Sequence, residues 1–356
     1  MTESTQVVNN NNIAKDRDAS IYLPKGTVLR NRYQITDKLA QGGFGITYKA
    51  IDNYFEKVVV IKEFYMKNLS IRSGHNSDVI VTGNSESSNQ FSVFKNKFLK
   101  EARTIAKFKE CESIVNVLDI FESNGTAYYV MDFIPGESLE EYVKKKGFLS
   151  IEESHALIVD VAKTLEFIHQ NNYLHLDITP RNIMRNDQGK IILIDFGVSK
   201  HYEESAGIQT TTTSVAHSPG YAPLEQYRSE VSTFYPATDI YSLGAVYYFL
   251  LTGKRPPEAD VDLELDFPNR VPTEVQTIIT HMMQPAPKQR PQNIKELMQI
   301  LVLPSNTPTI EPINENGTFN FTGTIDTNKT HELIPFKWII IAIVVFFAIA
   351  YISQYF

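Results

Sequence analysis

One short segment constrains this chain more than any other. Residues 175–182 read His-Leu-Asp-Ile-Thr-Pro-Arg-Asn, and an Asp-Phe-Gly triplet begins further on at Asp195. The apolar run of residues 191–194 before the triplet predicts a strand, so a short loop between two strands can hold Asp177 and Asn182 on one rim while Asp195 approaches from the next strand. A carboxylate base, an amide and a second carboxylate are the groups that phosphoryl transfer from a metal-bound nucleotide requires.

A glycine-rich turn lies far upstream of this segment. Residues 39–48 read Leu-Ala-Gln-Gly-Gly-Phe-Gly-Ile-Thr-Tyr, which predicts a strand, a turn and a second strand. Glycine lets backbone N–H groups approach a phosphate without a Cβ in the way. Taken alone, the same glycines would more often indicate an ordinary hairpin turn.

A lysine and a glutamate favour the nucleotide interpretation of that turn. The β-branched run of residues 58–61 ends at Lys62, and residues 98–108 show the apolar spacing of a helix. One face of this helix carries Phe98, Ala102, Ile105 and Ala106. Glu101 lies beside that face and can turn inward. A lysine that holds the α- and β-phosphates needs a carboxylate to orient it, and Glu101 is the candidate.

Across residues 30–303 the chain resembles a protein kinase domain of the bacterial, eukaryotic-like (Hanks-type) serine/threonine family. Three later segments add to the motifs above: residues 218–225 resemble the end of an activation segment, residues 239–244 resemble the start of a buried central helix, and Arg290 resembles the arginine that pairs with Glu225. The resemblance implies an α+β bilobal fold, with a β-rich small lobe to about residue 133 and a helical large lobe over residues 134–303.

The resemblance also implies ATP and Mg²⁺ as cofactors and proteins as substrates. Asp177 would accept the proton of the substrate hydroxyl, Asn182 and Asp195 would bind the metal, and Lys62 paired with Glu101 would hold ATP. The backbone of residues 132–134 would offer hydrogen bonds to adenine. The residues expected to contact ATP are Leu39, Ala40, Gln41, Gly42, Gly43, Phe44, Gly45, Ile46, Thr47, Val60, Lys62, Asp132, Phe133, Ile134 and Met184.

Three departures from the family pattern concern specificity and control. Leu176 stands where most members carry an arginine that grips a phosphorylated activation segment, and leucine cannot bind phosphate. Thr179 stands where serine/threonine members carry a lysine. Arg181 could supply that charge, because it stands at the position where tyrosine kinases carry an arginine. Arg181 is therefore a candidate catalytic residue. Whether the substrate hydroxyl belongs to serine and threonine or to tyrosine is left open. The hydroxyl-rich residues 210–214 are candidate autophosphorylation sites on which activity should depend weakly.

The segments outside this domain have different compositions. Residues 1–29 are largely polar with an Asn-rich run and predict disorder, whereas residues 304–335 are rich in Asn, Thr and Pro and predict a flexible linker. Residues 337–356 predict a transmembrane helix, because no charge follows Lys337 and the apolar stretch is long enough for a ~30 Å hydrocarbon core. We expect a single-pass membrane anchor with the catalytic domain in the cytoplasm, although sequons in the linker would favour a lumenal side.

Charge and cysteine content exclude some alternatives. A net charge of −7 and a pI near 5.7 argue against a nucleic-acid partner. The single cysteine, Cys111, excludes an internal disulfide.

The segment between Lys62 and Glu101, residues 64–97, is too long for a simple connection and is either a surface ornament or a docking site. The sequence also leaves a homodimer open.

Two other functional classes compete with an active protein kinase. A pseudokinase scaffold at the membrane would bind ATP or partners without transfer. Such a scaffold has no need to retain the four residues Lys62, Asp177, Asn182 and Asp195 together. A small-molecule kinase of related fold is disfavoured by the activation-segment ending at residues 222–225. The enzyme is therefore the favoured hypothesis.

Overall fold

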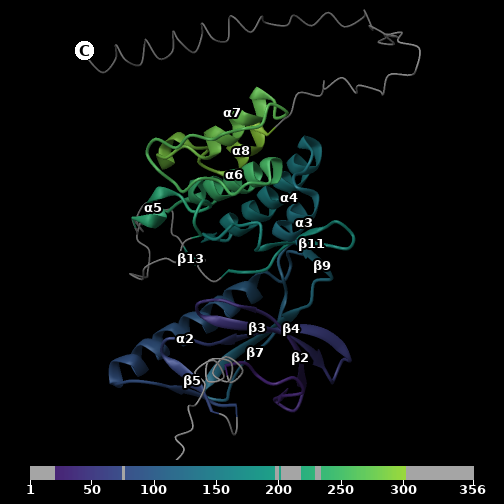
Figure 1. The fold of residues 1–356 in the computed structure, drawn as a ribbon, viewed down its shortest axis with the longest axis vertical. Coiled ribbons are helices and arrows are strands. Elements are labelled where there is room, and N and C mark those ends of the chain that lie inside the picture. The colour runs from purple at the N-terminus through teal and green to yellow at the C-terminus, as the bar shows by residue number, and fades with distance from the viewer. Residues whose placement is uncertain (1–20, 74–76, 197–199, 202–217, 229–233, 302–356) are drawn as a thin grey trace, which may run out of the picture. The chain divides into compact units, whose positions relative to one another are not determined.

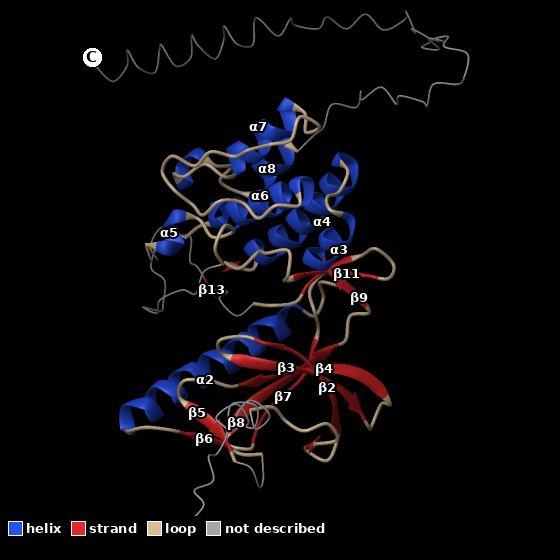
Figure 2. Cartoon of the chain, in the orientation of Figure 1, coloured by secondary structure: helices blue, strands red, loops and turns tan. Residues whose placement is uncertain are grey.

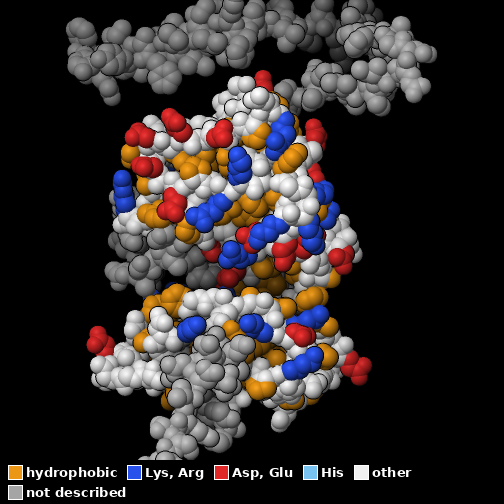
Figure 3. Space-filling model, in the orientation of Figure 1, with side chains coloured by type: hydrophobic (Ala, Val, Ile, Leu, Met, Phe, Trp, Pro, Cys, Tyr) orange, Lys and Arg blue, Asp and Glu red, His pale blue; other side chains and the backbone are white. Residues whose placement is uncertain are grey.

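The computed structural model describes residues 21–73, 77–196, 200–201, 218–228 and 234–301. The chain divides into two compact units, Met1–Leu303 and Pro304–Phe356, and the described residues all belong to the first. Within that unit an antiparallel sheet with one long helix forms a small lobe, and the remaining helices form a large lobe (Figure 1). On the face drawn in Figure 3 a hollow separates the two lobes.

The small lobe is built on a six-stranded sheet with the strand order β1-β2-β3-β4-β8-β7 (Figure 2). Its strands are β1 Val28–Leu29, β2 Tyr33–Gln41, β3 Gly45–Asp52, β4 Lys57–Phe64, β7 Val117–Ser123 and β8 Thr126–Asp132. Strand β4 pairs with β3 on one side and with β8 on the other. Because side chains alternate along a strand, Lys62 and Glu63 of β4 point to opposite faces of the sheet.

Helix α2, Ser85–Ile105, covers the Lys62 face of the sheet. It begins where the Asn84 side chain accepts a hydrogen bond from the backbone N–H of Ser87, which satisfies one of the free N–H groups of the first turn. Its apolar side packs on β4, with the Phe64 ring 5.0 Å from that of Phe91 and 5.6 Å from that of Phe98 between centroids. A short 3₁₀ turn, η1 Ala106–Phe108, follows.

Residues 85–97 of the predicted insertion 64–97 therefore belong to the helix that carries Glu101. The rest of the insertion contains a small hairpin, β5 Ser70–Arg72 and β6 Val79–Val81, which pairs within itself. Burial of Val79 and Phe91 shows that the segment is part of the small-lobe core rather than a surface ornament.

Residues 21–29 correct the expected extent of N-terminal disorder. The prediction that disorder reaches residue 29 is wrong for this stretch, because β1 pairs with β2 and Leu23 is buried against the sheet. The backbone N–H of Leu23 also donates to the Tyr48 hydroxyl at 3.1 Å. A few apolar residues are enough to hold the segment, because the sheet offers them an apolar face.

The large lobe is mainly helical. Its helices are α3 Leu139–Lys146, α4 Ile151–Gln170, the short α5 Leu224–Tyr227, α6 Pro236–Thr252, α7 Thr273–Met282 and α8 Ile294–Ile300, with a 3₁₀ turn η3 at Pro287–Gln289. Helix α6 is buried along nearly its whole length and packs against α4 and α7. The strands are β9 Gly136–Ser138, β11 Ile183–Asn186 and β12 Ile191–Leu193 in one small sheet, and β10 Tyr173–Leu174 with β13 Lys200–His201 in another.

The chain after α2 is joined directly to the strand before Asp195. Ile114 forms a parallel bridge with Leu193 of β12, the N–H of Val115 donates to the Leu193 carbonyl at 2.9 Å, and the N–H of Leu193 donates to the Ser113 carbonyl at 2.9 Å. These bonds fix β12, and with it Asp195, relative to the small lobe.

Several predicted segments lie outside the described residues. They are the N-terminal stretch 1–20, the hydroxyl-rich run 210–214, the linker 304–335 and the membrane helix 337–356. Within the parts of the chain that the structure describes, no helix combines the length and the apolar character needed to cross a bilayer.

Candidate active site

Lys62 lies between two carboxylates that come from different elements. Its Nζ is 3.2 Å from Oε1 of Glu101 on α2 and 3.0 Å from Oδ1 of Asp195, which follows β12. The three side chains are 17%, 10% and 36% exposed, so Asp195 is the one most open to solvent. Burial alone would lower the pKa of Lys62, but the charges of Asp195 and Glu101 outweigh it and raise that pKa well above its ordinary value. Lys62 is therefore a stable cation.

Glu101 is held by a tyrosine as well as by the lysine. The Tyr129 hydroxyl on β8 donates to Glu101 Oε1 at 3.0 Å, and Oε1 is also the oxygen that faces Lys62. Burial raises the pKa of Glu101, and the charge of Lys62 offsets part of that effect. The pairing of Lys62 with Glu101 that the sequence predicts is present.

Asp177 and Asn182 form the opposite rim. The Asn182 side-chain N–H₂ donates to Asp177 Oδ2 at 2.8 Å and to the Asp177 carbonyl at 3.0 Å. The Ser218 hydroxyl donates to the other carboxylate oxygen, Oδ1, at 2.7 Å. Burial raises the pKa of Asp177, the Ser218 hydrogen bond lowers it in part, and the nearby charge of Asp195 raises it again. Asp177 is thus a fixed carboxylate with an increased affinity for a proton.

The loop that carries Asp177 is anchored on α6. Asp239 accepts hydrogen bonds from the backbone N–H of His175 at 2.9 Å and of Leu176 at 2.7 Å, and from His169 Nε2 at 2.8 Å. Burial opposes ionisation of Asp239, but the His169 hydrogen bond outweighs it, so its pKa lies below the ordinary range. Leu176 has a φ of +63°, a strained conformation for a non-glycine residue, which the two N–H bonds to Asp239 help to hold.

Phe196 orients the triplet to which Asp195 belongs. Its side chain is buried, with ring centroids 4.6 Å from that of His175 and 5.9 Å from that of Phe108. Because Phe196 points into this cluster, its neighbour Asp195 faces Lys62. Gly197 lies outside the described residues.

The glycine-rich turn connects β2 to β3 above Lys62. The Gly42 N–H donates to the Gly45 carbonyl at 2.8 Å, and Thr47 is the cross-strand partner of Lys62. A Cβ on Gly45 would lie 2.8 Å from the Glu63 carbonyl oxygen, so this position requires glycine. The Phe44 ring stacks on Phe94 of α2 at 5.0 Å.

The remaining residues expected at the nucleotide site lie on β2, β3, β4, β11 and the turns and connection that join these elements. Leu39 to Phe44 are exposed, Gly45, Ile46 and Val60 are buried, and Thr47 and Met184 are half-buried. At the connection between the lobes, Asp132 accepts from Lys57 Nζ at 3.2 Å and from the Asn116 amide at 3.2 Å. Phe133 and Ile134 follow, both half-buried.

Arg181 is the predicted site residue that stands apart. Its side chain is 77% exposed, and a guanidinium nitrogen lies 3.6 Å from Glu140 Oε1. The structure therefore places Arg181 near α3 at the surface, whereas Asp177 is held by Asn182 and Ser218.

The predicted pair of Glu225 and Arg290 is confirmed. The two guanidinium nitrogens of Arg290 lie 2.7 and 3.0 Å from the two carboxylate oxygens of Glu225, and both side chains are buried.

Sequence reasoning missed Ser218, Tyr129 and Asp239 as parts of the site. Ser218 and Asp239 stood in motifs already recognised, whereas Tyr129 lies in an apolar strand that carries no signal.

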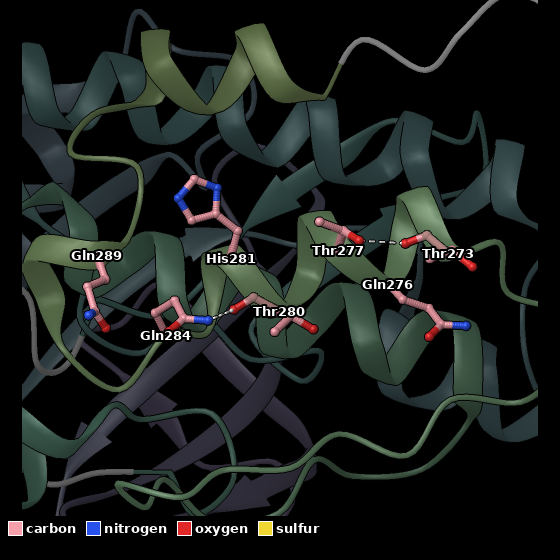
Figure 4. A pocket seen from close by; sticks show the side chains of 7 residues that line it. All are labelled: Thr273, Gln276, Thr277, Thr280, His281, Gln284 and Gln289. Atoms are coloured by element: carbon pink, nitrogen blue, oxygen red, sulfur yellow. Dashed lines mark hydrogen bonds between the residues drawn. The ribbon is translucent and has the colours of Figure 1, made fainter. Parts of the chain in front are cut away.

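A second hollow lies away from these residues, on α7. It has a volume of about 380 Å³ and is lined by Thr, Gln and His side chains (Figure 4). No lysine or carboxylate is among its lining residues.

Comparison with known proteins agrees with this geometry. The family model described as "Protein kinase domain" matches residues 33–304. A probable serine/threonine-protein kinase of Clostridium acetobutylicum is 30% identical over 78% of this chain and 40% of its own length, and PknA of Mycobacterium tuberculosis is 30% identical over 78% and 58%. The apo form of PpkA-294 matches with a TM-score of 0.67 and 30% identity, over 79% of this chain and all of that one.

The chain thus spans less than two thirds of the length of these curated relatives. The match to the family model nevertheless covers most of this chain and includes both lobes. The chain belongs to the protein kinase domain family, in its bacterial serine/threonine (Hanks-type) branch.

Proposed function

We propose that this chain transfers the γ-phosphate of ATP to serine or threonine hydroxyls of proteins. The observation that carries the proposal is the meeting of two groups of side chains: Lys62 with Glu101 and Asp195 on one side, and Asp177 with Asn182 on the other. The serine/threonine class is supported by the names of the curated relatives.

The residues present fit a Mg²⁺–nucleotide complex. Asp195 and Asn182 offer oxygen ligands, and Mg²⁺ commonly keeps several waters and binds one or two protein groups together with phosphates. The Asn182 nitrogen is engaged by Asp177, so its amide oxygen is the atom suited to the metal. When bound, the metal neutralises charge on the phosphates. Lys62, held by Glu101, would bind the phosphates because it is a half-buried cation opposite Thr47, which follows the glycine-rich turn.

Asp177 would orient the incoming hydroxyl and accept its proton. The hydrogen bonds from Asn182 and Ser218 fix both carboxylate oxygens in place. A raised pKa brings a carboxylate closer to the proton affinity that general base catalysis favours. Arg181 would contribute positive charge near the transferred group, from the surface side of the loop. Autophosphorylation within residues 210–214 is a further part of the proposal.

The direct test is to incubate the full chain with labelled ATP, Mg²⁺ and peptides that present serine, threonine or tyrosine. We expect phosphoserine and phosphothreonine, and far less label with Asp177→Asn. Binding of ATP without any transfer would contradict the enzyme and favour a scaffold. Label on tyrosine alone would overturn the proposed specificity.

We also propose that residues 337–356 anchor the chain in a membrane with the kinase domain in the cytoplasm, and that residues 304–335 act as a flexible linker. The support is the uncharged apolar sequence after Lys337. These residues, fused to a soluble reporter, should carry it into the membrane fraction and resist alkaline extraction. Release by high salt alone would contradict the anchor, and cleavage of the kinase domain by protease added outside intact cells would reverse the orientation.

A further inference from the structure

Tyr129 occupies a place in the site that no motif marks. It lies in the middle of β8 as the cross-strand partner of Lys62. Its hydroxyl donates to Glu101 Oε1 at 3.0 Å, and the same oxygen lies 3.2 Å from Lys62 Nζ. We infer that Tyr129 is a positioning residue that holds the Glu101 carboxylate, and through it Lys62, in the geometry for nucleotide binding. The inference rests on the proposed function, since it concerns the same site.

The tyrosine ring is fixed in its position. It is fully buried, and its centroid lies 5.0 Å from that of Phe98, which is three residues before Glu101 on α2. The Lys62 ammonium lies 5.6 Å from the ring centroid. Because the ring packs on the helix that carries Glu101, its hydroxyl reaches the carboxylate from one fixed direction.

This second donor matters because Lys62 has more than one partner. Lys62 contacts Asp195 as well as Glu101, and it would have to reach nucleotide phosphates too. If the lysine turns toward a phosphate, the buried carboxylate of Glu101 loses part of its stabilisation. The Tyr129 hydroxyl then remains as a donor, so Glu101 stays in place while Lys62 changes partner.

The neighbouring residue provides a matched control. Tyr128 is also fully buried, and its hydroxyl donates to a buried carboxylate, Glu63 Oε1, at 2.7 Å. The two tyrosines are adjacent in β8, so their side chains point to opposite faces of the sheet. Tyr128 therefore matches Tyr129 in burial and in its hydrogen bond to a carboxylate, while it lies away from the nucleotide side.

The test compares Tyr129→Phe with Tyr128→Phe in the full chain. Each substitution removes one hydroxyl and keeps the ring, so the packing is retained. Three quantities are measured: the Kd for a non-hydrolysable ATP analogue with Mg²⁺, the KM for ATP against kcat, and amide hydrogen exchange of residues 98–105 without nucleotide. The binding and exchange measurements need no turnover, so they separate failure of this inference from failure of the proposed activity.

For Tyr129→Phe we expect the Kd and KM for ATP to rise about tenfold, the change that one lost hydrogen bond to a charged group gives. We expect kcat to fall less, and exchange of residues 98–105 to become faster. Tyr128→Phe should change the nucleotide constants less than about twofold, although it lowers the unfolding temperature. Equal effects of the two substitutions on the nucleotide constants, or unchanged constants in Tyr129→Phe, would overturn the inference.

A double substitution tests whether Tyr129 acts through Glu101. If it does, adding Tyr129→Phe to Glu101→Gln should weaken nucleotide binding no further than Glu101→Gln alone. Additive losses would mean that Tyr129 acts independently of Glu101, which would contradict its assignment as a positioning residue.

Discussion

Two clusters of charged side chains lie on opposite faces of the small-lobe sheet. Each is built around one of two adjacent residues of β4, Lys62 and Glu63. On the α2 face, Lys62 contacts the carboxylates of Glu101 and Asp195. On the other face, Glu63 accepts from the Tyr48 hydroxyl at 3.0 Å, the Tyr128 hydroxyl at 2.7 Å and the Arg72 guanidinium at 2.6 Å. We call them the Lys62 cluster and the Glu63 cluster.

The Glu63 cluster is closed and balanced. One cation faces one anion, and the side chains of Arg72 and Glu63 are 3% and 0% exposed. Arg72 also donates to the carbonyls of Ile21 at 2.7 Å and Ser77 at 2.8 Å, so it ties the N-terminal segment and the β5–β6 hairpin to β4. A guanidinium suits this task because its planar fork donates in several fixed directions.

The Lys62 cluster is open and unbalanced. One cation faces two carboxylates, and Asp195 is 36% exposed. An ammonium can exchange partners without breaking a fixed bidentate geometry, so a phosphate can replace one carboxylate. Similar residue types therefore stabilise the fold on one face and are suited to nucleotide binding on the other. The two clusters differ in the ratio of cations to carboxylates and in their exposure to solvent.

The largest expected effect separates activity from stability. Asp177→Asn should lower kcat by about 10²–10⁴-fold, the usual contribution of a general base, and leave ATP binding nearly unchanged. The free energy of unfolding should not fall, because burial already disfavours the Asp177 carboxylate. Steady-state kinetics and urea unfolding of the same preparation check both parts. A wild-type rate would remove Asp177 from the mechanism.

The next largest effect concerns the stability that the Glu63 cluster contributes. Arg72→Met should lower the free energy of unfolding by about 3–5 kcal/mol, because it leaves the buried Glu63 carboxylate without its cation. The double substitution Glu63→Gln with Arg72→Met should be less destabilised than Arg72→Met alone. Lys95→Met, which breaks a more exposed pair with Glu122, is the control and should change little. A small loss for Arg72→Met would mean that the Glu63 cluster is not a structural anchor.

A smaller effect concerns the pH dependence of activity, which follows from the ionisation of the proposed base, Asp177. Burial raises the pKa of Asp177, and the Ser218 hydrogen bond lowers it in part, so Ser218→Ala should raise it further. A base must be ionised, so activity falls as the pH falls through this pKa. The acidic limb of kcat/KM should therefore move to higher pH in Ser218→Ala, with a loss of about 3–10-fold at neutral pH. An acidic limb that stays in place, or moves to lower pH, would contradict the contact.

The smallest effect is expected at Arg181. Its side chain is 77% exposed, and a solvated charge contributes about 1 kcal/mol or less to a transition state. Arg181→Gln should therefore lower kcat by at most about fivefold, and Arg181→Lys should retain most of it. A loss as large as that of Asp177→Asn would show that Arg181 moves into the site during catalysis.

The two clusters also differ in how well the sequence predicts them. Lys62, Asp177 and Asp195 stand in motifs whose spacing and strand pattern are informative, and the structure brings them together with Glu101 and Asn182. The Glu63 cluster carries no such signal. A charged residue near the end of a strand is usually solvated, and the burial of Glu63 depends on Arg72 in a segment without periodicity.

The same reason explains two other differences between prediction and structure. Tyr129 reads as one more residue of an apolar strand, because its hydroxyl partner is contributed by a helix far away in sequence. The order of residues 21–29 depends on their own apolar residues and on the sheet against which these pack, which the polar composition of residues 1–29 taken as a whole conceals. Buried polar partners that stand in motifs, such as Glu225 and Arg290, were predictable, whereas partners outside any motif, such as Tyr129 and Arg72, were not.

The most direct test of the account applies one chemical change to both clusters, Glu101→Gln and Glu63→Gln, in otherwise identical full chains. Glu101→Gln should lower kcat/KM for ATP by about 10–100-fold, the effect of one charge-assisted contact, with little change in unfolding free energy because Lys62 keeps Asp195. Glu63→Gln should lower the unfolding free energy by about 3–5 kcal/mol, while the folded fraction keeps its kcat/KM within a small factor. If Glu63→Gln lost as much kcat/KM as Glu101→Gln at a temperature where both are folded, the division between a functional and a structural face would be wrong.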